Sequence, residues 1–531
     1  MLTAIELLRR GRGDEIWSRY CGFIDLGMAE FMEIQNGLLL EQIQRLGQCE
    51  LGRKLLGDGV PDTVEAFRRD VPLTTYEDYI PYLTEKQEDV LPEAPYVWTR
   101  TSGRSGAYDT KWVPYTRGQY EKFSLYMLAG FIFASTEQKG AFVFEEGDIM
   151  FATLGPPPYV SGAVIGPGSL EHFPFTCIPP LDAEGGDFQE RIAQGFQVAL
   201  RDGIDVCYAL ASVLVRVGEQ FERQSSNFDA KQLLQPKVAL RLAKGLIKSK
   251  LAGRPLLPKD LWTVKAVAAG GTDMDIYRDR IEYYWGKAPL EGYACTELGL
   301  TSFTTWNTSL TFVPDMSFWE FIPEEEHLKS RQDPAYQPRT VLLDEVQPGQ
   351  IYEIVGTNFH GGAFVRYRVG DLVEITARRD EEHGIDIPQM VFHARADDII
   401  DLGGFTRLTE RSIAWALENA KIAYSDWTAR KDAGESGPRI HLYIEGKDHE
   451  HRDAQAVGQA VHGCLQDLEP EYRDWIEVMH GDPPVVTLLS PGTFERYMAE
   501  KQAQGADLAQ LKPVRMKPSD EVMADLLRQS T

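Results

Sequence analysis

The chain has 531 residues, of which 43% are hydrophobic and 25% are charged, and its formal net charge is −25. This balance is typical of a globular protein, and the length allows more than one domain. Since phosphate backbones attract basic surfaces, the acidic chain is not expected to bind nucleic acid.

The cysteines and the apolar segments indicate in which cellular compartment the protein is expected. The six cysteines are scattered, with no C-x-x-C pair, which argues against a zinc site or a disulfide framework and favours a reducing cytoplasm. No segment approaches about 18 uninterrupted apolar residues, and the N-terminus lacks the charged-then-apolar order of a signal peptide. We therefore expect a cytoplasmic protein with no membrane partner.

The first quarter of the chain is predicted to be mainly helical. Residues 1–57 are expected to form helices, because apolar side chains recur at helical spacing within 31–55. A capped helix start is expected at Asp62–Glu65, a proline-bounded connector at 71–81, and a further helix at 119–134.

Between about 140 and 300, predicted strands and helices alternate. Residues 150–154 are expected to form a short buried strand, 206–217 a core-facing helix, and 262–272 a strand that ends in a glycine turn. Strands separated by helices indicate a largely parallel sheet. A turn at the carboxyl end of such a strand is where α/β proteins bind ligands.

The pattern then becomes richer in strands and finally changes again. Within 311–376 the predicted strands are 317–322, 350–355 and 372–376. After Arg395, a helix is expected from Thr409 and a strand at 440–444. We place the domain boundary between about 390 and 405, so that the C-terminal part forms a small α/β lid.

A segment with the chemistry of a phosphate-binding loop runs from Thr101 to Lys111. It contains hydroxyl side chains, glycines and a lysine, namely Thr101, Ser102, Ser105, Gly103, Gly106 and Lys111. Small residues let backbone N–H groups converge on an anion, hydroxyls donate hydrogen bonds, and the lysine supplies a mobile positive charge. The spacing differs from the G-x-x-x-x-G-K-[ST] motif, and a surface turn is the alternative interpretation.

A second turn-rich motif is Gly292–Gly299. An exposed Tyr293 could stack on a purine, the Thr296 hydroxyl could donate to a phosphate, and the Glu297 carboxylate could hold Mg²⁺. The alternative is a helix start with Thr296 and Glu297 near the cap.

Two further motifs carry charge beside glycine. In Arg366–Asp371, the Asp371 carboxylate could accept both ribose hydroxyls while the arginines balance phosphate charge, although an ordinary strand with a surface ion pair would look the same. In Arg395–Phe405, paired glycines suit a hinge, with a plain interdomain loop as the alternative.

Taken in order, these motifs resemble the Gretchen Hagen 3 acyl-acid amido synthetases, the auxin-conjugating family of the adenylate-forming superfamily. The segments that carry the resemblance are 71–79, 101–106 with Lys111 and Pro114, 270–272, 293–297, 318–323, 364–371, 491–494 and 510–515. The ordered set covers nearly the whole chain and is more specific than any one motif.

The resemblance implies an α/β fold in two parts. Residues 1–396 would form a large adenylate-forming domain, with stacked sheets and a small barrel, that binds ATP and the acid. Residues 397–531 would form a small, mobile α/β lid domain.

The resemblance also implies roles for individual residues. ATP phosphates would be held by Ser102, Gly103, Ser105 and Lys111; Tyr293 would lie against adenine, Thr296 at the α-phosphate, Glu297 on Mg²⁺, Asp371 on the ribose, and Lys512 would come from the lid. Thr101, Gly106, Gly271, Thr272 and Arg395 complete the implied nucleotide site, and Lys111, Thr296, Glu297 and Lys512 would act in catalysis.

The chain departs from the family's pattern at three places. Arg104 stands where the family usually has threonine, and Cys295–Thr296 replaces a pair of serines. The segment Ala107–Thr110, which leads from the glycines to Lys111, is also unusual for the family. Cys295 is interpreted as a packed small residue, with a nucleophile as the alternative.

The implied reaction is an ATP-dependent ligation. The enzyme would adenylate a small carboxylic acid and transfer the acyl group to an amine or amino acid, releasing AMP and pyrophosphate. The alternatives are an acyl-CoA ligase with the same first half-reaction and a catalytically silent protein that binds ATP or an acid.

Overall fold

The computed structural model describes residues 2–57, 59–101, 111–155, 157–180, 188–224, 235–270, 274–333, 335–396, 398–402, 406–433, 438–447, 453–469, 472–473, 475–476, 482–504 and 515–530. The chain divides into two compact units. The first comprises Met1–Thr101, Lys111–Val369 and Val373–Phe392, and the described part of the second comprises Gly370–Leu372 and residues from His393 onward. The functional division after residue 396 stays a prediction.

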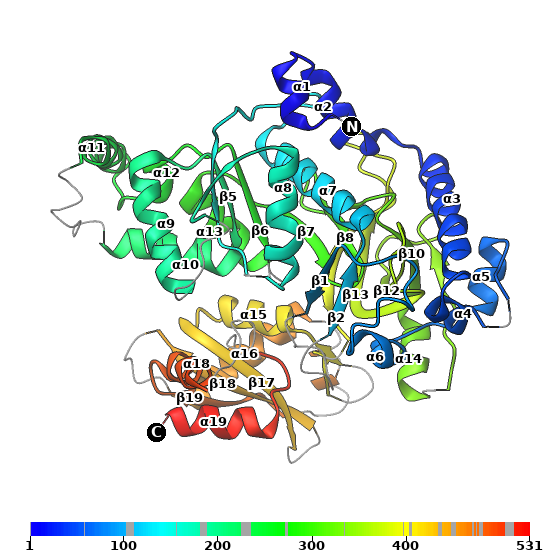
Figure 1. Cartoon of the computed structure of the whole chain (residues 1–531). Helices are drawn as coiled ribbons and strands as arrows, with labels where there is room; N and C mark the ends of the chain where they lie inside the picture. Colours follow the sequence, from blue (N-terminus) through cyan, green and yellow to red (C-terminus); the bar gives the residue numbers. More distant parts are fainter. Residues whose placement is uncertain are drawn as a thin grey trace. The chain divides into compact units, whose positions relative to one another are not determined.

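Helices dominate the first 300 residues, and their order is shown in Figure 1. The helices before residue 396 are α1 (Ala4–Arg9), α2 (Gly13–Tyr20), η1 (Gly22–Asp25), α3 (Met28–Leu46), α4 (Glu50–Leu56), α5 (Val64–Asp70), η2 (Tyr76–Asp78), α6 (Ile80–Leu83), α7 (Arg117–Ser135), η3 (Ser161–Ile165), α8 (Gly166–His172), α9 (Phe188–Asp202), α10 (Ala211–Gln224), α11 (Pro236–Leu251), α12 (Pro258–Leu261), α13 (Met274–Trp285) and α14 (Glu324–Gln332). The predicted helices at 31–55, at Asp62–Glu65 and at 119–134 are thus confirmed as α3 with α4, α5 and α7.

The strands before residue 396 form a two-stranded ribbon and one large sheet. They are β1 (Val97–Arg100), β2 (Trp112–Tyr115), β3 (Ile149–Ala152), β4 (Thr176–Ile178), β5 (Val206–Leu210), β6 (Ala266–Gly270), β7 (Leu290–Cys295), β8 (Gly299–Thr304), β9 (Leu310–Phe312), β10 (Ser317–Pro323), β11 (Val341–Leu342), β12 (Ile351–Asn358), β13 (Tyr367–Ala377) and β14 (Gln389–Arg395). The ribbon pairs β1 with β2, and the sheet has the order β11-β10-β12-β13-β14-β9-β8-β7-β6-β5-β3-β4.

The large sheet is parallel at one end and antiparallel at the other. Strands β4, β3, β5, β6 and β7 pair in parallel, which confirms the arrangement expected for 140–300. Strand β8 pairs antiparallel with both β7 and β9, and short turns rather than helices join these three strands within the fully described residues 290–312. The mixed α/β class is as expected, and the finer expectation of stacked sheets and a barrel stays a prediction.

The helix predicted at 206–217 is wrong in its first half. Val206–Leu210 is strand β5, which pairs with β3 on one side and β6 on the other, and α10 begins only at Ala211. Both faces of β5 are covered: Cys207 and Ala209 belong to the core under the neighbouring helices, while Tyr208 contacts Phe131 of α7. A strand buried on both faces loses the polar alternation that would distinguish it from a helix.

Helix α7 is placed by a cap next to the ribbon. The N–H of Gln119 donates to Thr116 Oγ1 and the Gln119 side chain accepts from the Thr116 N–H, each over 3.2 Å. This capping box satisfies donors that the helix itself leaves open. Since Thr116 follows β2 directly, the cap fixes the direction in which α7 runs across β6, β7 and β8.

The second unit has its own small sheet. Its elements are β15 (Ile400–Asp401), β16 (Arg407–Leu408), α15 (Glu410–Asn419), β17 (Tyr424–Ala433), β18 (Pro438–Gly446), α16 (Ala454–Leu468), β19 (Val485–Leu489), α18 (Thr493–Ala503) and α19 (Asp520–Ser530). Strand β18 pairs antiparallel with β17 and parallel with β19. Thr409 caps α15 by accepting from the Ser412 N–H, which confirms the helix start predicted there.

Candidate active site

The two ends of the predicted phosphate-binding segment are hydrogen-bonded to each other. In the β1–β2 ribbon, Arg100 lies opposite Trp112. Beyond this pair, the Thr101 N–H donates to the Lys111 carbonyl over 2.9 Å, and the Lys111 N–H donates to Thr101 Oγ1 over 3.2 Å. Thr101 and Lys111 are thus held at the end of the ribbon. The other predicted phosphate ligands of this segment lie outside the described residues, namely Ser102, Gly103, Ser105 and Gly106.

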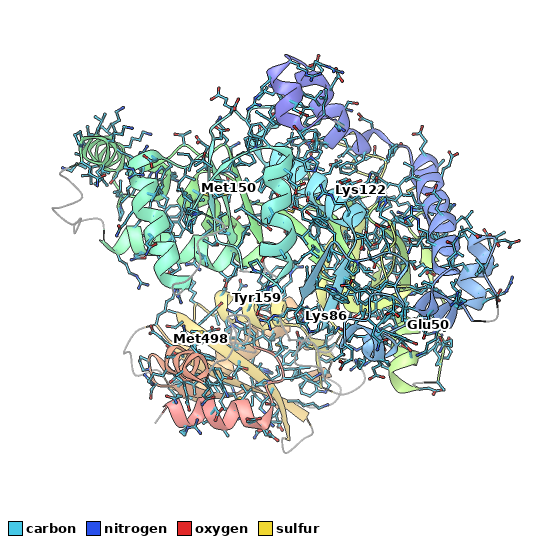
Figure 2. All side chains as sticks on the ribbon, viewed as in Figure 1. Glu50, Lys86, Lys122, Met150, Tyr159 and Met498 are labelled. Atoms are coloured by element: carbon cyan, nitrogen blue, oxygen red, sulfur yellow. The ribbon has the colours of Figure 1, made fainter. Side chains whose placement is uncertain are left out.

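Aromatic and cationic side chains fix the strand that follows Lys111. Tyr76 OH donates to the Trp112 carbonyl over 3.0 Å and accepts from the Trp112 N–H over 2.7 Å. The ammonium of Lys86, labelled in Figure 2, lies 3.4 Å from the centroid of the Trp112 ring, which is a cation–π contact. Burial raises the pKa of Tyr76 to about 12, so its phenol is protonated at neutral pH. Held through its backbone and ring, Trp112 restrains the neighbouring Lys111.

Glu297 lies in the turn of a hairpin. Strand β7 ends at Cys295 and β8 begins at Gly299, whose φ of +76° is a conformation that glycine adopts readily. The Thr296 carbonyl in this turn accepts a hydrogen bond from Tyr115 OH over 2.8 Å, which ties the turn to the β1–β2 ribbon. The alternative of a helix start at this motif is therefore wrong.

Lys111, Glu297 and Tyr367 make a three-way contact within the first unit. Lys111 Nζ lies 3.2 Å from Glu297 Oε1 and 3.0 Å from Tyr367 OH. Tyr367 OH in turn donates to Glu297 Oε1 over 2.9 Å. The side chains of Lys111 and Glu297 are only 11% and 8% exposed. The fold thus brings the predicted phosphate-binding cation and the predicted metal ligand into direct contact.

The two oxygens of the Glu297 carboxylate are used differently. Oε1 accepts both bonds, whereas Oε2 has no hydrogen-bond donor among the residues that the structure describes. Burial, reinforced by the charge of Glu297, raises the pKa of Tyr367, so the phenol stays protonated and donates to Oε1. The arrangement leaves Oε2 as the oxygen through which Glu297 could bind a cation.

The chemistry of this carboxylate fits magnesium. Mg²⁺ prefers oxygen ligands and is usually held by one or two carboxylates together with substrate phosphates. Within the described ranges, no three His, Cys, Asp or Glu side chains converge into a cage that could hold a metal ion by themselves. A single carboxylate such as Glu297 is the kind of ligand that could hold magnesium together with substrate phosphates.

Tyr293 is less accessible than the sequence suggested. It lies on β7 opposite Ser302 of β8 and is 8% exposed, although an exposed ring was expected. Its ring stacks on Phe392, with centroids 6.1 Å apart and planes 28° apart. Its contact with adenine stays a prediction.

The arginines beside Tyr367 are engaged in the core. Arg366 donates to Glu320 through Nε over 3.0 Å and through Nη2 over 2.8 Å, and these two side chains are 6% and 1% exposed. Arg368 donates to both oxygens of Glu353 over 2.9 and 2.6 Å. Both arginines are thus paired with buried carboxylates, and the expectation that they balance phosphate charge stays a prediction.

The contacts of Glu353 with His327 and Arg368 are expected to make the stability of the fold depend on pH. Burial opposes ionisation of Glu353, but hydrogen bonds with His327 and Arg368 outweigh it and keep its pKa below the usual range. A carboxyl with a lowered folded-state pKa stabilises the fold above its unfolded pKa, and this stabilisation is lost as the pH falls through the folded pKa. We expect Glu353→Gln to lower Tm strongly at pH 7, and the difference from the parent protein to shrink below about pH 4. Thermal unfolding across this range checks it, and a constant difference would contradict it.

Asp371 and Arg395 lie in the second unit and pair with each other. Arg395 Nε is 3.5 Å from Asp371 Oδ1, and the carboxylate side chain is 8% exposed. The Ala396 N–H donates to the Gly370 carbonyl over 2.9 Å, which holds the two segments together. Their contacts with a ribose or phosphate stay predictions. The remaining predicted residues lie outside the described residues, namely Gly271, Thr272 and Lys512.

Two side chains at this site were not singled out from the sequence. Tyr367 lies inside the motif Arg366–Asp371. In this motif the sequence assigns a function only to the charged residues. Asn358 of β12 donates from Nδ2 to the Glu297 carbonyl over 3.1 Å. It is 61 residues away in the chain, so no local pattern could have indicated this contact.

Three family models match the chain in order. A model described as the GH3 family N-terminal domain matches residues 22–173, the central-domain model matches 310–395, and the C-terminal-domain model matches 409–521. Together they cover most of the chain and follow the order expected for one family.

Curated relatives are similar over part of the chain. An Arabidopsis thaliana protein, "Indole-3-acetic acid-amido synthetase GH3.17", is 25% identical over 299 residues, which cover 49% of this chain and 47% of that protein. A rice protein (Oryza sativa subsp. japonica), "Jasmonoyl--L-amino acid synthetase GH3.5", is 23% identical over 280 residues, covering 48% and 46%. The matched region spans less than half the length of these relatives.

Solved structures share the fold over almost the whole chain. "AtGH3.15 acyl acid amido synthetase in complex with 2,4-DB" superposes with a TM-score of 0.68 at 20% identity and covers 94% of each chain. "2-Hydroxyisobutyryl-CoA Ligase (HCL) in the postadenylation state" superposes with a TM-score of 0.62 at 17% identity, covering 95% of this chain and 93% of that one. At such identities the likeness is one of fold.

Proposed function

Because the chain belongs to the GH3 family, we propose that it is an ATP-dependent acyl-acid amido synthetase. It adenylates a small carboxylic acid and transfers the acyl group to an amine or amino acid, with release of pyrophosphate and AMP. The observation that carries this proposal is the contact of Lys111 with Glu297 beside the predicted phosphate-binding segment. Family membership and the names of the curated relatives support the choice of an amide product.

The first half-reaction needs charge stabilisation more than covalent chemistry. A carboxylate is a poor electrophile, and attack on the α-phosphate of ATP gives it AMP as a leaving group. Negative charge then grows on the phosphoryl oxygens and on the departing pyrophosphate. Lys111 supplies a cation at the end of the β1–β2 ribbon, and Thr296 supplies a hydroxyl in the hairpin turn. Each preorganised donor of this kind typically contributes about 100- to 1,000-fold in rate.

The other site residues orient the nucleotide. Glu297 would hold Mg²⁺, which neutralises phosphate charge when it is bound. Tyr293 would lie against adenine, and Asp371 would accept the ribose hydroxyls, with Arg395 beside it as a further nucleotide contact. Ser102, Gly103, Ser105 and Gly106 would donate to phosphates, and Lys512 would act from the C-terminal part.

The second half-reaction uses an amine as nucleophile. In our proposal the C-terminal residues 397–531 act as a lid that shields the acyl-adenylate from water before the amine attacks. The enzyme is proposed to work in the cytoplasm, in keeping with six cysteines that form no disulfide. Among the described helices, none is long and apolar enough to cross a bilayer.

The proposal is tested by identifying the product. The enzyme is screened for pyrophosphate release over a panel of carboxylic acids, and each active acid is then offered with amino acids or with CoA. Mass spectrometry is expected to show an amide with an amino acid. A thioester as the sole product would assign the chain to the acyl-CoA ligases instead, and no release with any acid would contradict adenylation.

A further inference from the structure

Tyr367 is a neutral side chain that contacts both charges of the Lys111–Glu297 pair. Its phenol oxygen accepts from Lys111 Nζ over 3.0 Å, and its O–H donates to Glu297 Oε1 over 2.9 Å. The phenol is therefore a donor to one partner and an acceptor from the other at the same time. The ammonium–carboxylate contact itself is slightly longer, at 3.2 Å. The three groups form a closed triangle of hydrogen bonds.

The backbone that carries Tyr367 is fixed on both sides. Arg366 and Arg368, its neighbours in the chain, are held by the buried carboxylates of Glu320 and Glu353. The Tyr367 ring also packs against Phe364, with centroids 4.8 Å apart. Because backbone and ring are both restrained, the phenol oxygen is held in a fixed position. From there it makes its hydrogen bonds with Lys111 and Glu297.

A ligand that binds only Lys111 or only Glu297 would break their ion pair at a large cost in free energy. Lys111 and Glu297 are both largely buried, and a buried charge left without its partner is strongly unfavourable. A nucleotide that draws Lys111 away would leave Glu297 unpaired and close to its phosphates. A cation that binds Glu297 would leave Lys111 facing another positive charge. A nucleotide and a cation that arrive together supply both missing partners.

We propose that Tyr367 is a positioning residue that couples magnesium binding to nucleotide binding. In the ligand-free enzyme it holds Lys111 and Glu297 against each other. If Lys111 pairs with the phosphates, the phenol would keep its bond to Oε1 and would leave Oε2 available to a cation. This inference rests on the proposed function and adds a role for a residue that makes no predicted contact with the nucleotide.

The coupling is measured by nucleotide binding without turnover. Isothermal titration calorimetry, with no acid present, gives the Kd of ATP with magnesium and with a chelator. The ratio of the two values is the coupling, which is reciprocal between metal and nucleotide. We expect Tyr367→Phe to reduce this ratio several-fold, and Glu297→Gln to bind metal-free ATP roughly tenfold more tightly than the parent, within the usual range of such couplings.

Tyr79→Phe is the matched control. Tyr79 is buried in the same aromatic cluster, 6.1 Å from the Tyr367 ring, but its hydroxyl bonds to Thr74 and to the backbone of Val365. Its loss is expected to lower Tm without changing the ratio. An unchanged ratio in folded Tyr367→Phe, with normal binding of magnesium-bound ATP, would refute the role of Tyr367 and leave the proposed function standing. Failure of the parent protein to bind ATP under either condition would refute both.

Discussion

Glu297→Gln is expected to abolish adenylation while the protein stays folded. The substitution keeps the size of the side chain and a carbonyl oxygen toward Tyr367 and Lys111. It removes the negative charge that a magnesium ion needs, so phosphate charge in the transition state is no longer neutralised. We expect a loss of at least about 1,000-fold in acid-dependent pyrophosphate exchange, the upper end of the effect of one electrostatic contact.

The same variant separates binding from catalysis. It should bind metal-free ATP more tightly than the parent and still fail to turn over. Glu121→Ala, at an exposed carboxylate on α7, is the control and should exchange pyrophosphate at the parent rate. A folded Glu297→Gln protein with undiminished exchange would remove Glu297 from the metal role.

Lys111→Met is expected to have the second-largest effect. Methionine fills a similar volume but cannot donate to phosphate oxygens or to Tyr367. Exchange should fall about 100- to 1,000-fold, as for the loss of one preorganised donor. Because Glu297 is then buried without its cation, Tm should fall as well, since breaking a buried pair typically costs roughly 3–5 kcal/mol.

Lys111→Met needs a control that shows the effect of removing one lysine charge elsewhere in the protein. Lys139→Met removes an exposed ammonium that pairs with Asp25 on the surface, and exchange and Tm should both change little. If Lys111→Met left exchange within a few-fold of the parent, the ammonium would have no part in charge stabilisation. The 101–111 segment would then be the surface turn that its composition also allowed.

Local patterns in the sequence were sufficient for most helices and for the class of fold. The cap at Thr409 and the periodicity of α3 and α7 depend on neighbouring residues, so they could be predicted directly. Val206–Leu210 could not, because a strand covered on both faces has the same apolar run as a buried helix.

The site was predictable only where its residues stand in motifs. Lys111, Thr296 and Glu297 belong to segments whose hydroxyls, glycines and charges indicate phosphate chemistry, and the hairpin and ribbon place them together. Arg366 and Arg368 show the limit of this reasoning, since the same charges serve buried ion pairs. Tyr367 acquires its role only from the fold, which brings it to a carboxylate 70 residues away.

In our proposal a magnesium-bound triphosphate reacts with an organic acid at the Lys111–Glu297 pair. The exchange of labelled pyrophosphate into ATP by the full chain, measured with and without added carboxylic acids, tests this reaction most directly. We expect exchange that requires both an acid and magnesium and that disappears in Glu297→Gln. Exchange that is absent with every acid offered, or that survives unchanged in Glu297→Gln, would contradict it.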